Sequence, residues 1–385
     1  MTNQQERKLV QNAAATAEIS VLRVEGGVTE YQVMIHATQP HQTFDAQLSA
    51  ILDTYYGLIE GELHGASSVF KRYFLSDAAN QKDRLLSAMP ESPACSCSIV
   101  EQPPLNGTKV ALWAYLLSEV GMQSFENNMY ATCHGAYKHL WRGTALLPDG
   151  DSHYQATKLL DELTLQLMTE KGTLLDNCVR TWFFVQNIDA NYAGVVTARN
   201  EVFAAQGLTP KTHFISSTGI NGRGADYRAC VQLDSYSVIG LEPGQMNFLY
   251  APDYLNPTYE YGVSFERGTY VDYGDRRQVF ISGTASIDNK GNVLHLGDIR
   301  NQTLRMWENV EALLAEADCN FDDVGQMIVY LRDVADYPVV SQMFEERFPG
   351  VPKVIVYAPV CRPGWLIEME CMATKKIDNA AYKPF

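Results

Sequence analysis

Apolar and polar positions near the C-terminal end predict a compact alternation of strands and helices. Residues 276–288 and 323–336 are rich in β-branched and aromatic side chains, which is typical of strands. Between them, residues 297–317 place apolar side chains at the spacing of one helix face. A short helix and two further strands are expected after this, at 338–348, 352–360 and 365–373.

The same order of elements appears twice more upstream. Helix, strand, helix, strand, turn and strand are expected in succession within residues 43–118, and again within residues 152–233. Dividing the 385 residues by three gives about 128 per unit, a common size for one domain. We therefore expect three α+β domains, at residues 15–122, 123–240 and 241–385, each with a mixed β-sheet and helices on one face.

Differences among the three copies indicate where chemistry lies. Four residues after a turn glycine the copies carry Ala111, Arg228 and Glu368, so only the third has a carboxylate there. The third copy also has a guanidinium, Arg332, at the end of its middle strand. We therefore expect the first two copies to be degenerate and the third to carry the site.

Charge and composition narrow the class of ligand. The chain has 30 Lys plus Arg and 45 Asp plus Glu, which gives a net charge of −15. Such a balance argues against binding to nucleic acid or to an anionic membrane, because both need clustered cations. Any anionic ligand therefore requires a local basic pocket.

Other sequence signals concern location and cofactors. No apolar stretch reaches the roughly 20 residues of a membrane span, and the first residues lack the apolar core of a signal peptide. We expect a cytoplasmic protein whose eight cysteines are free thiols. No metal-binding spacing of histidines and no glycine-rich nucleotide loop occurs in the sequence, so no metal and no cofactor are expected.

Five stretches carry a resemblance to a known family. They are YAPDYLNPTYEYGVSFERG (250–268), VFISGTASI (279–287), HLGDIRNQT (295–303), VYLRD (329–333) and CRPGWLIEMEC (361–371). In this order they resemble the Rid (YjgF-like, endoribonuclease L-PSP-like) family, whose small α+β domains form trimers with sites between subunits. A closer similarity is to the chorismatases, in which such domains are fused in one chain. The resemblance implies three tandem Rid/chorismate-mutase-like domains with pseudo-threefold symmetry, as a monomer with an internal pseudo-trimer or as a dimer.

The resemblance also implies a reaction. Chorismatases hydrolyse the enol-pyruvyl ether of chorismate, which begins with protonation of the vinyl carbon. Glu368 lies between Ile367 and Met369 in an apolar strand, where burial would raise its pKa. Alternation puts Glu370 on the same face, where we expect a salt-bridged residue. Cys361 matches a family position that could steer water or proton transfer, and packing alone is the alternative.

Candidate substrate-binding residues follow from the same comparison. Arg267 matches the family arginine and is the first choice as anion anchor, whereas Arg332 is equally consistent with a structural ion pair. The backbone of the glycine-containing strand would approach the substrate closely. The remaining candidates are Lys353, Arg362, Tyr254, Tyr261, Gly283, Thr284 and Ala285.

The chain departs from the family pattern at informative positions. Glu266 stands where the family has Ala, and Trp182-Phe183-Phe184 replaces a Trp-Asn-Tyr element. Lys353 occupies the position of the arginine with which simple Rid deaminases bind a substrate carboxylate. Two alternatives to chorismatase activity therefore stay open, namely an enamine/imine deaminase and a non-catalytic binder of small anions.

Overall fold

The computed structural model describes residues 5–90 and 95–385 and contains three six-stranded sheets. In each sheet, the strands of one unit are arranged in the order 1-2-3-6-4-5, and only the neighbours 4 and 5 run parallel. The α+β class and the threefold repetition expected from the sequence are thus confirmed. The strands of the three sheets occupy 5–118, 121–239 and 246–376, and the domain boundaries remain predictions.

The first unit comprises β1 (Gln5–Gln11), β2 (Ala15–Leu22), β3 (Glu30–Ala37), α1 (Phe44–Glu60), β4 (Ala66–Leu75), α2 (Ala78–Ala88), β5 (Ser96–Glu101) and β6 (Val110–Ser118). The second comprises β7 (Gly121–Ser124), β8 (Met129–His134), β9 (Tyr137–Leu146), α3 (Ser152–Thr169), α4 (Leu174–Asn177), β10 (Cys178–Val185), α5 (Ile188–Ala205), β11 (Ser216–Asn221) and β12 (Val231–Ile239). The third comprises β13 (Met246–Leu249), η1 (Thr258–Tyr261), β14 (Gly268–Asp272), β15 (Arg276–Ala285), α6 (Ile299–Glu316), η2 (Phe321–Asp323), β16 (Val324–Leu331), η3 (Val334–Asp336), α7 (Tyr337–Arg347), β17 (Lys353–Tyr357) and β18 (Ile367–Lys376).

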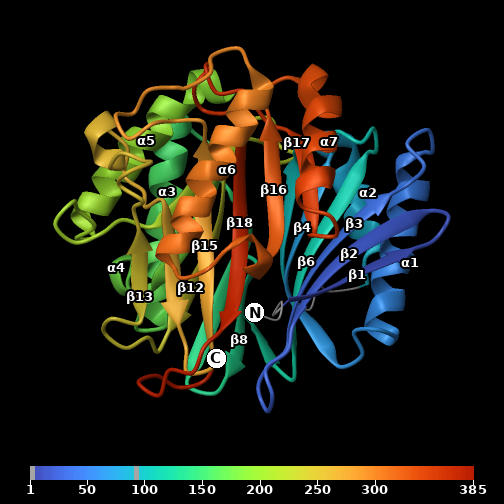
Figure 1. Ribbon diagram of the computed structural model, residues 1–385, viewed down its shortest axis with the longest axis horizontal. Helices are drawn as coiled ribbons and strands as arrows, with labels where there is room; N and C mark the ends of the chain where they lie inside the picture. Colours follow the sequence, from blue (N-terminus) through green and yellow to red (C-terminus); the bar gives the residue numbers. More distant parts are fainter. Residues whose placement is uncertain (1–4, 91–94) are drawn as a thin grey trace.

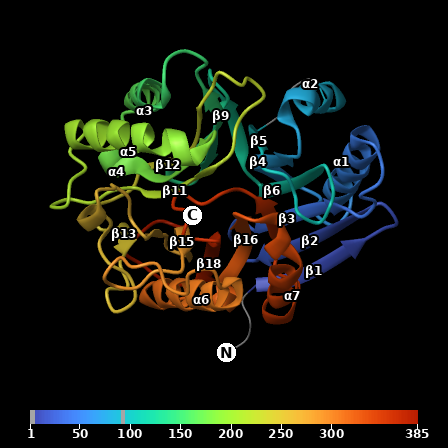
Figure 2. The ribbon, with the colours of Figure 1, turned by 90° about the horizontal axis from the view of Figure 1, so that it is seen from above.

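The three units surround a common centre, with the long helices outside and the sheets inside (Figures 1 and 2). Each main helix begins at a capping side chain, because Thr43, Asp151 and Asp298 accept hydrogen bonds from the first turns of α1, α3 and α6. The apolar faces of these helices pack on their own sheets. No helix of the described residues is long and apolar enough to cross a membrane.

The inner faces of the sheets share one core. Rings from different units stack there, including Phe70 of β4, Trp141 of β9 and Trp182 of β10. Arg72 is fully buried in this core and forms an ion pair with Asp234, at 3.0 Å, so that it ties the first unit to the second. Such shared burial makes the three units one packed body.

Strand register corrects one comparison made from the sequence. In every unit, the residue that follows the fourth strand (β4, β10 or β16) donates its backbone N–H to the carbonyl of the residue just before the last strand. In the second unit this bond joins Gln186 to Cys230. Counted from this bond, the counterpart of Glu368 in β12 is Gln232 and not Arg228. Arg228 lies before β12, exposed and paired with Asp226. The segment between the turn glycine and the last strand is longer in the second copy than in the other two. Counting a fixed number of residues from the glycine therefore gave the wrong counterpart.

Candidate functional site

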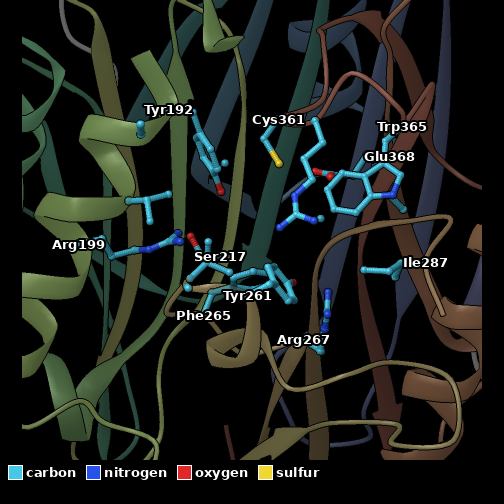
Figure 3. Close-up of a pocket in the computed structure, with 18 of the residues that line it drawn as sticks. Tyr192, Arg199, Ser217, Tyr261, Phe265, Arg267, Ile287, Cys361, Trp365 and Glu368 are labelled. Carbon is cyan, nitrogen blue, oxygen red and sulfur yellow. The ribbon is translucent and has the colours of Figure 1, made fainter. Parts of the chain in front are cut away.

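A cavity of about 340 Å³ lies between the second and third units (Figure 3). Helix α5 and strand β11 supply one wall, while β15, the loop after η1 and the turn before β18 supply the other. The volume falls in the range of small-molecule sites. It is lined by Tyr192, Ala193, Val196, Thr197, Arg199, Ser217, Gly219, Tyr261, Gly262, Val263, Phe265, Arg267, Gly283, Ala285, Ile287, Cys361, Arg362, Trp365 and Glu368.

Glu368 reaches this cavity because of an irregularity in the neighbouring strand. It pairs with Tyr330 on one side and with Ala285 on the other, and the register of β15 shifts between residues 281 and 284. Gly283 lies in that shift, directly against the carboxylate, and a Cβ there would overlap it. The bulge and its glycine therefore make room for the acid.

The environment of Glu368 favours its protonated form. Its side chain is 5% exposed, and burial raises its pKa to about 8. The neighbouring charge of Glu370 contributes to this rise, and the charges of Arg180 and Arg267 oppose it. At neutral pH this residue is therefore mostly a buried carboxylic acid that can donate a proton.

Glu370 has a different environment from Glu368, although both lie on the same face of β18. Arg180 donates to its carboxylate at 2.8 Å, and the indole Nε1 of Trp182 donates at 2.7 Å. The hydroxyl of Thr218 donates as well. The expectation that Glu370 is salt-bridged is confirmed, and neighbouring carboxylates in contrasting environments can take separate roles.

Two buried arginines face the cavity from opposite walls. Arg199 on α5 is 1% exposed, and its Nε and Nη2 have no hydrogen-bond partner among the described residues. It contacts the rings of Phe183 and Phe265 instead. Arg267 is 5% exposed, and its Nη2 donates to the backbone and side-chain oxygens of Asn256 at 2.9 and 3.2 Å. Buried guanidinium donors without partners are costly, and an anion in the cavity would satisfy them.

The thiol and phenol groups of the cavity are neutral near pH 7. Burial raises the pKa of the Cys361 thiol to about 12, and the charge of Glu368 acts in the same direction. Burial also raises the pKa values of Tyr192 and Tyr261. Arg362 lies over the rings of Tyr261 and Trp365. The cavity therefore combines three cations with one protonated acid, although the whole chain carries −15.

Seven of the residues suggested by the sequence meet at this cavity. They are Glu368, Cys361, Arg267, Tyr261, Gly283, Ala285 and Arg362. The other four lie elsewhere. Thr284 is fully buried and donates to the carbonyl of Ser282, on the far side of the strand. Tyr254 is 39% exposed beneath Arg305.

Arg332 does not line the cavity either, because it pairs with Asp189 at 2.6 Å and donates to the carbonyl of Val360 at 2.7 Å. Of its two suggested roles, this geometry is that of the structural ion pair. Its partner lies on α5, so the pair joins the second and third units.

Lys353 lies at another interface, between the third unit and the first. Its ammonium pairs with Glu18 at 3.1 Å and with Glu345 at 3.0 Å. The pairing of strands shows which residue of the second unit is equivalent to Lys353. It is Ser217 of β11, which pairs with β10 as Lys353 of β17 pairs with β16. A strand that belongs to the neighbouring unit therefore faces Glu368, and it presents a hydroxyl there instead of a cation.

Residues of the second unit were absent from the sequence-based candidates. Tyr192, Val196 and Arg199 follow the i, i+4, i+7 spacing of one face of α5, and Ser217 lies on β11. The helix spacing was visible in the sequence, but its packing against another unit was not. The second copy thus supplies a wall of the cavity as well as the hydrogen-bond partners of Glu370, while Arg72 of the first unit lies 3.8 Å from the same carboxylate.

Comparisons with known proteins agree with this architecture. The Endoribonuclease L-PSP family model matches residues 265–375. A RutC family protein of Pyrococcus abyssi is 35% identical over 100 residues, which cover 26% of this chain and 79% of that protein. The chain belongs to the Rid (YjgF/L-PSP) family.

Two further comparisons place this Rid protein among its relatives. The 3-aminoacrylate deaminase RutC of Acinetobacter baylyi is 33% identical over 97 residues, 25% of this chain and 77% of that protein. A chorismatase crystal structure superposes with a TM-score of 0.62 at 18% identity and covers 80% of this Rid chain and 93% of its own. The overall fold is therefore chorismatase-like.

Proposed function

We propose that this Rid protein is a chorismatase-like hydrolase that cleaves the enol-pyruvyl ether of chorismate or of a related small carboxylate. The observation that carries the proposal is a buried acid, Glu368, in one cavity with Arg267 and with Arg199, whose Nε and Nη2 have no hydrogen-bond partner in the described part of the chain. An enol ether needs a proton donor at its vinyl carbon, and a dianion needs cations at both ends.

The first step uses the protonated carboxyl of Glu368. It transfers its proton to the terminal methylene carbon of the enol ether, which becomes a methyl group, and the ether carbon becomes an oxocarbenium ion. The carboxylate left behind is a counter-ion for this cation at short range and in a buried environment. A pKa of about 8 keeps the donor protonated at neutral pH without making it too weak an acid.

Water then adds to the ether carbon, and the Glu368 carboxylate takes back the proton that the water releases. The resulting hemiketal collapses to pyruvate and an alcohol, so that substrate plus one water gives two products and restores the acid. The thiol of Cys361 and the hydroxyl of Tyr192 lie in the same cavity and stay protonated. They are suited to orient the water and are not nucleophiles.

Arg199 and Arg267 are suited to hold the two carboxylates of the substrate, with Arg362 at the more exposed side. Guanidinium groups bind carboxylates with two parallel hydrogen bonds, which fixes orientation as well as position. Both walls belong to one chain, so this proposal needs no second copy.

An enamine/imine deaminase is the second candidate, and the similarity to a 3-aminoacrylate deaminase favours it. Against it, the position of the deaminase arginine holds Ser217 at this cavity, while Lys353 lies elsewhere between Glu18 and Glu345. A non-catalytic binder of small anions is the third candidate, since the unpartnered Arg199 calls for an anion whether or not turnover follows.

One experiment separates the three. Purified protein is incubated with chorismate and pyruvate is measured, and in parallel 2-aminoacrylate is generated and ammonia release is followed. The proposal predicts pyruvate from wild-type protein and none from Glu368→Gln, with the fold retained. Faster ammonia release from 2-aminoacrylate, without pyruvate in the chorismate incubation, would support the deaminase. Chorismate binding with no product in either incubation would support the binder.

A further inference from the structure

A second cavity, of about 250 Å³, lies beside the first and shares Arg267 with it. The loop 209–214 of the second unit and the loop 250–259 of the third form most of its wall. Glu266 completes the wall, at the position where the related segments have Ala. Nothing in the proposed hydrolysis uses this cavity.

Glu266 is a buried carboxyl without a counter-ion. Its side chain is 7% exposed, and one oxygen accepts the backbone N–H of Phe214 at 2.8 Å. No lysine, arginine or histidine of residues 5–90 and 95–385 forms an ion pair with it, and Arg267, its neighbour in sequence, is bound to Asn256 instead. Burial raises the pKa of Glu266 to about 7, while the N–H of Phe214 and the charge of Arg267 oppose the shift.

Aromatic side chains line the same cavity as this carboxyl. Tyr250 and Tyr259 line the cavity and are about half exposed, which places them toward its opening. Phe214 lies in the same wall. Burial raises the pKa of Tyr250 to about 12, and the charge of Glu266 contributes to the rise, so the phenol is neutral near pH 7. Neutral rings around a carboxylate attract organic cations through the ring faces and the opposite charge.

We propose that the second cavity binds a small organic cation of the ammonium class, with Glu266 as its counter-ion and Tyr250 and Tyr259 as its aromatic wall. The bound cation replaces the proton of Glu266, so that binding below pH 7 releases one proton to solvent. The net charge of −15 raises the concentration of cations around the protein. The charged or titratable groups that act on Glu266 or line its cavity are Arg267, Tyr250, Tyr259 and His213.

Choline and ethylammonium are suitable probes, titrated calorimetrically into the wild-type protein at pH 6 and pH 8.5. The proposal predicts saturable binding with a Kd below about 1 mM. Titrations in two buffers with different protonation enthalpies should show release of nearly one proton per cation at pH 6 and almost none at pH 8.5. Acetate should not bind in this cavity.

Glu266→Gln keeps the shape of the side chain and an acceptor for the N–H of Phe214, and it should weaken cation binding at least tenfold and abolish the proton release. The matched control is Glu62→Gln, which removes an exposed carboxylate of the first unit and should change neither quantity. Absence of saturable binding to the wild type, or equal binding by Glu266→Gln, would overturn the proposal. Both readouts are independent of pyruvate release, so a failure here is distinguishable from a failure of the proposed hydrolysis.

Discussion

Replacing Glu368 by Gln should change how the stability of the protein depends on pH. The carboxyl has a pKa of about 8 in the folded state and about 4.5 when the chain is unfolded. Between these values the folded state keeps a proton that the unfolded state has lost, so the free energy of unfolding falls as pH rises. At about 1.4 kcal/mol per pH unit, the whole loss amounts to about 5 kcal/mol above pH 8.

The assay is urea unfolding of both proteins at pH 6 and at pH 9. By the same arithmetic, ionisation of this one group has lowered the free energy of unfolding of the wild type by about 2 kcal/mol at pH 6 and by about 5 kcal/mol at pH 9. Gln does not titrate, so the stability difference between variant and wild type should shift by about 3 kcal/mol in favour of the variant between the two values of pH. Glu266 and the other titrating groups are present in both proteins, so their contributions cancel in the difference between the two free energies of unfolding.

A shift below about 0.5 kcal/mol would refute the reasoning, because it would mean that Glu368 ionises in the folded protein as easily as in water. A shift of opposite sign would mean that the charges of Arg180 and Arg267 outweigh burial. Glu62→Gln, an exposed control, should show almost no dependence of this kind.

Three further substitutions test the parts of the site. Arg199→Gln should lower kcat/KM for chorismate about 10- to 100-fold with little loss of stability, because Nε and Nη2 of Arg199 have no hydrogen-bond partner to lose among the described residues; unchanged kinetics would remove it from the anion site. Gly283→Ala should abolish pyruvate release while the protein still folds, since the added methyl overlaps the Glu368 carboxylate; an active variant would contradict that contact. Glu370→Gln should lower the free energy of unfolding by about 3–5 kcal/mol, as measured by urea unfolding, because Arg180 would be left as an uncompensated buried charge; a neutral effect would mean that water replaces the ion pair.

The third unit could be predicted well because its local patterns and its fold agree. Helix α6 and strands β15, β16 and β18 lie where periodicity placed them, and the acid-bearing face of β18 followed from simple alternation. The first two strands of each sheet were not identified, and in the first two units the third strand, β3 or β9, was missed as well. The first two strands form hairpins at the outer end of each sheet, and their residues mix apolar and polar character, as in β1 (Gln5–Gln11) and β13 (Met246–Leu249).

The site could be predicted only on the side that belongs to the third unit. Arg199 and Ser217 reach Glu368 because the second unit packs against the third, and no periodicity within one unit encodes which neighbour it will face. The same reason explains Lys353, which sequence comparison assigned to the site although its strand faces the first unit. The counterpart of Glu368 in the second unit was misassigned to Arg228 because a longer turn shifted the count.

Carbon protonation by Glu368 is the central claim, and hydrolysis of chorismate in D₂O tests it most directly. In D₂O the exchangeable proton of this carboxyl becomes deuterium, and it should appear in the methyl group of the product. Mass spectrometry of pyruvate trapped as it forms should therefore show one deuterium per molecule from the wild type and no product from Glu368→Gln. Pyruvate without solvent deuterium, or equal release from the Gln variant, would contradict the account.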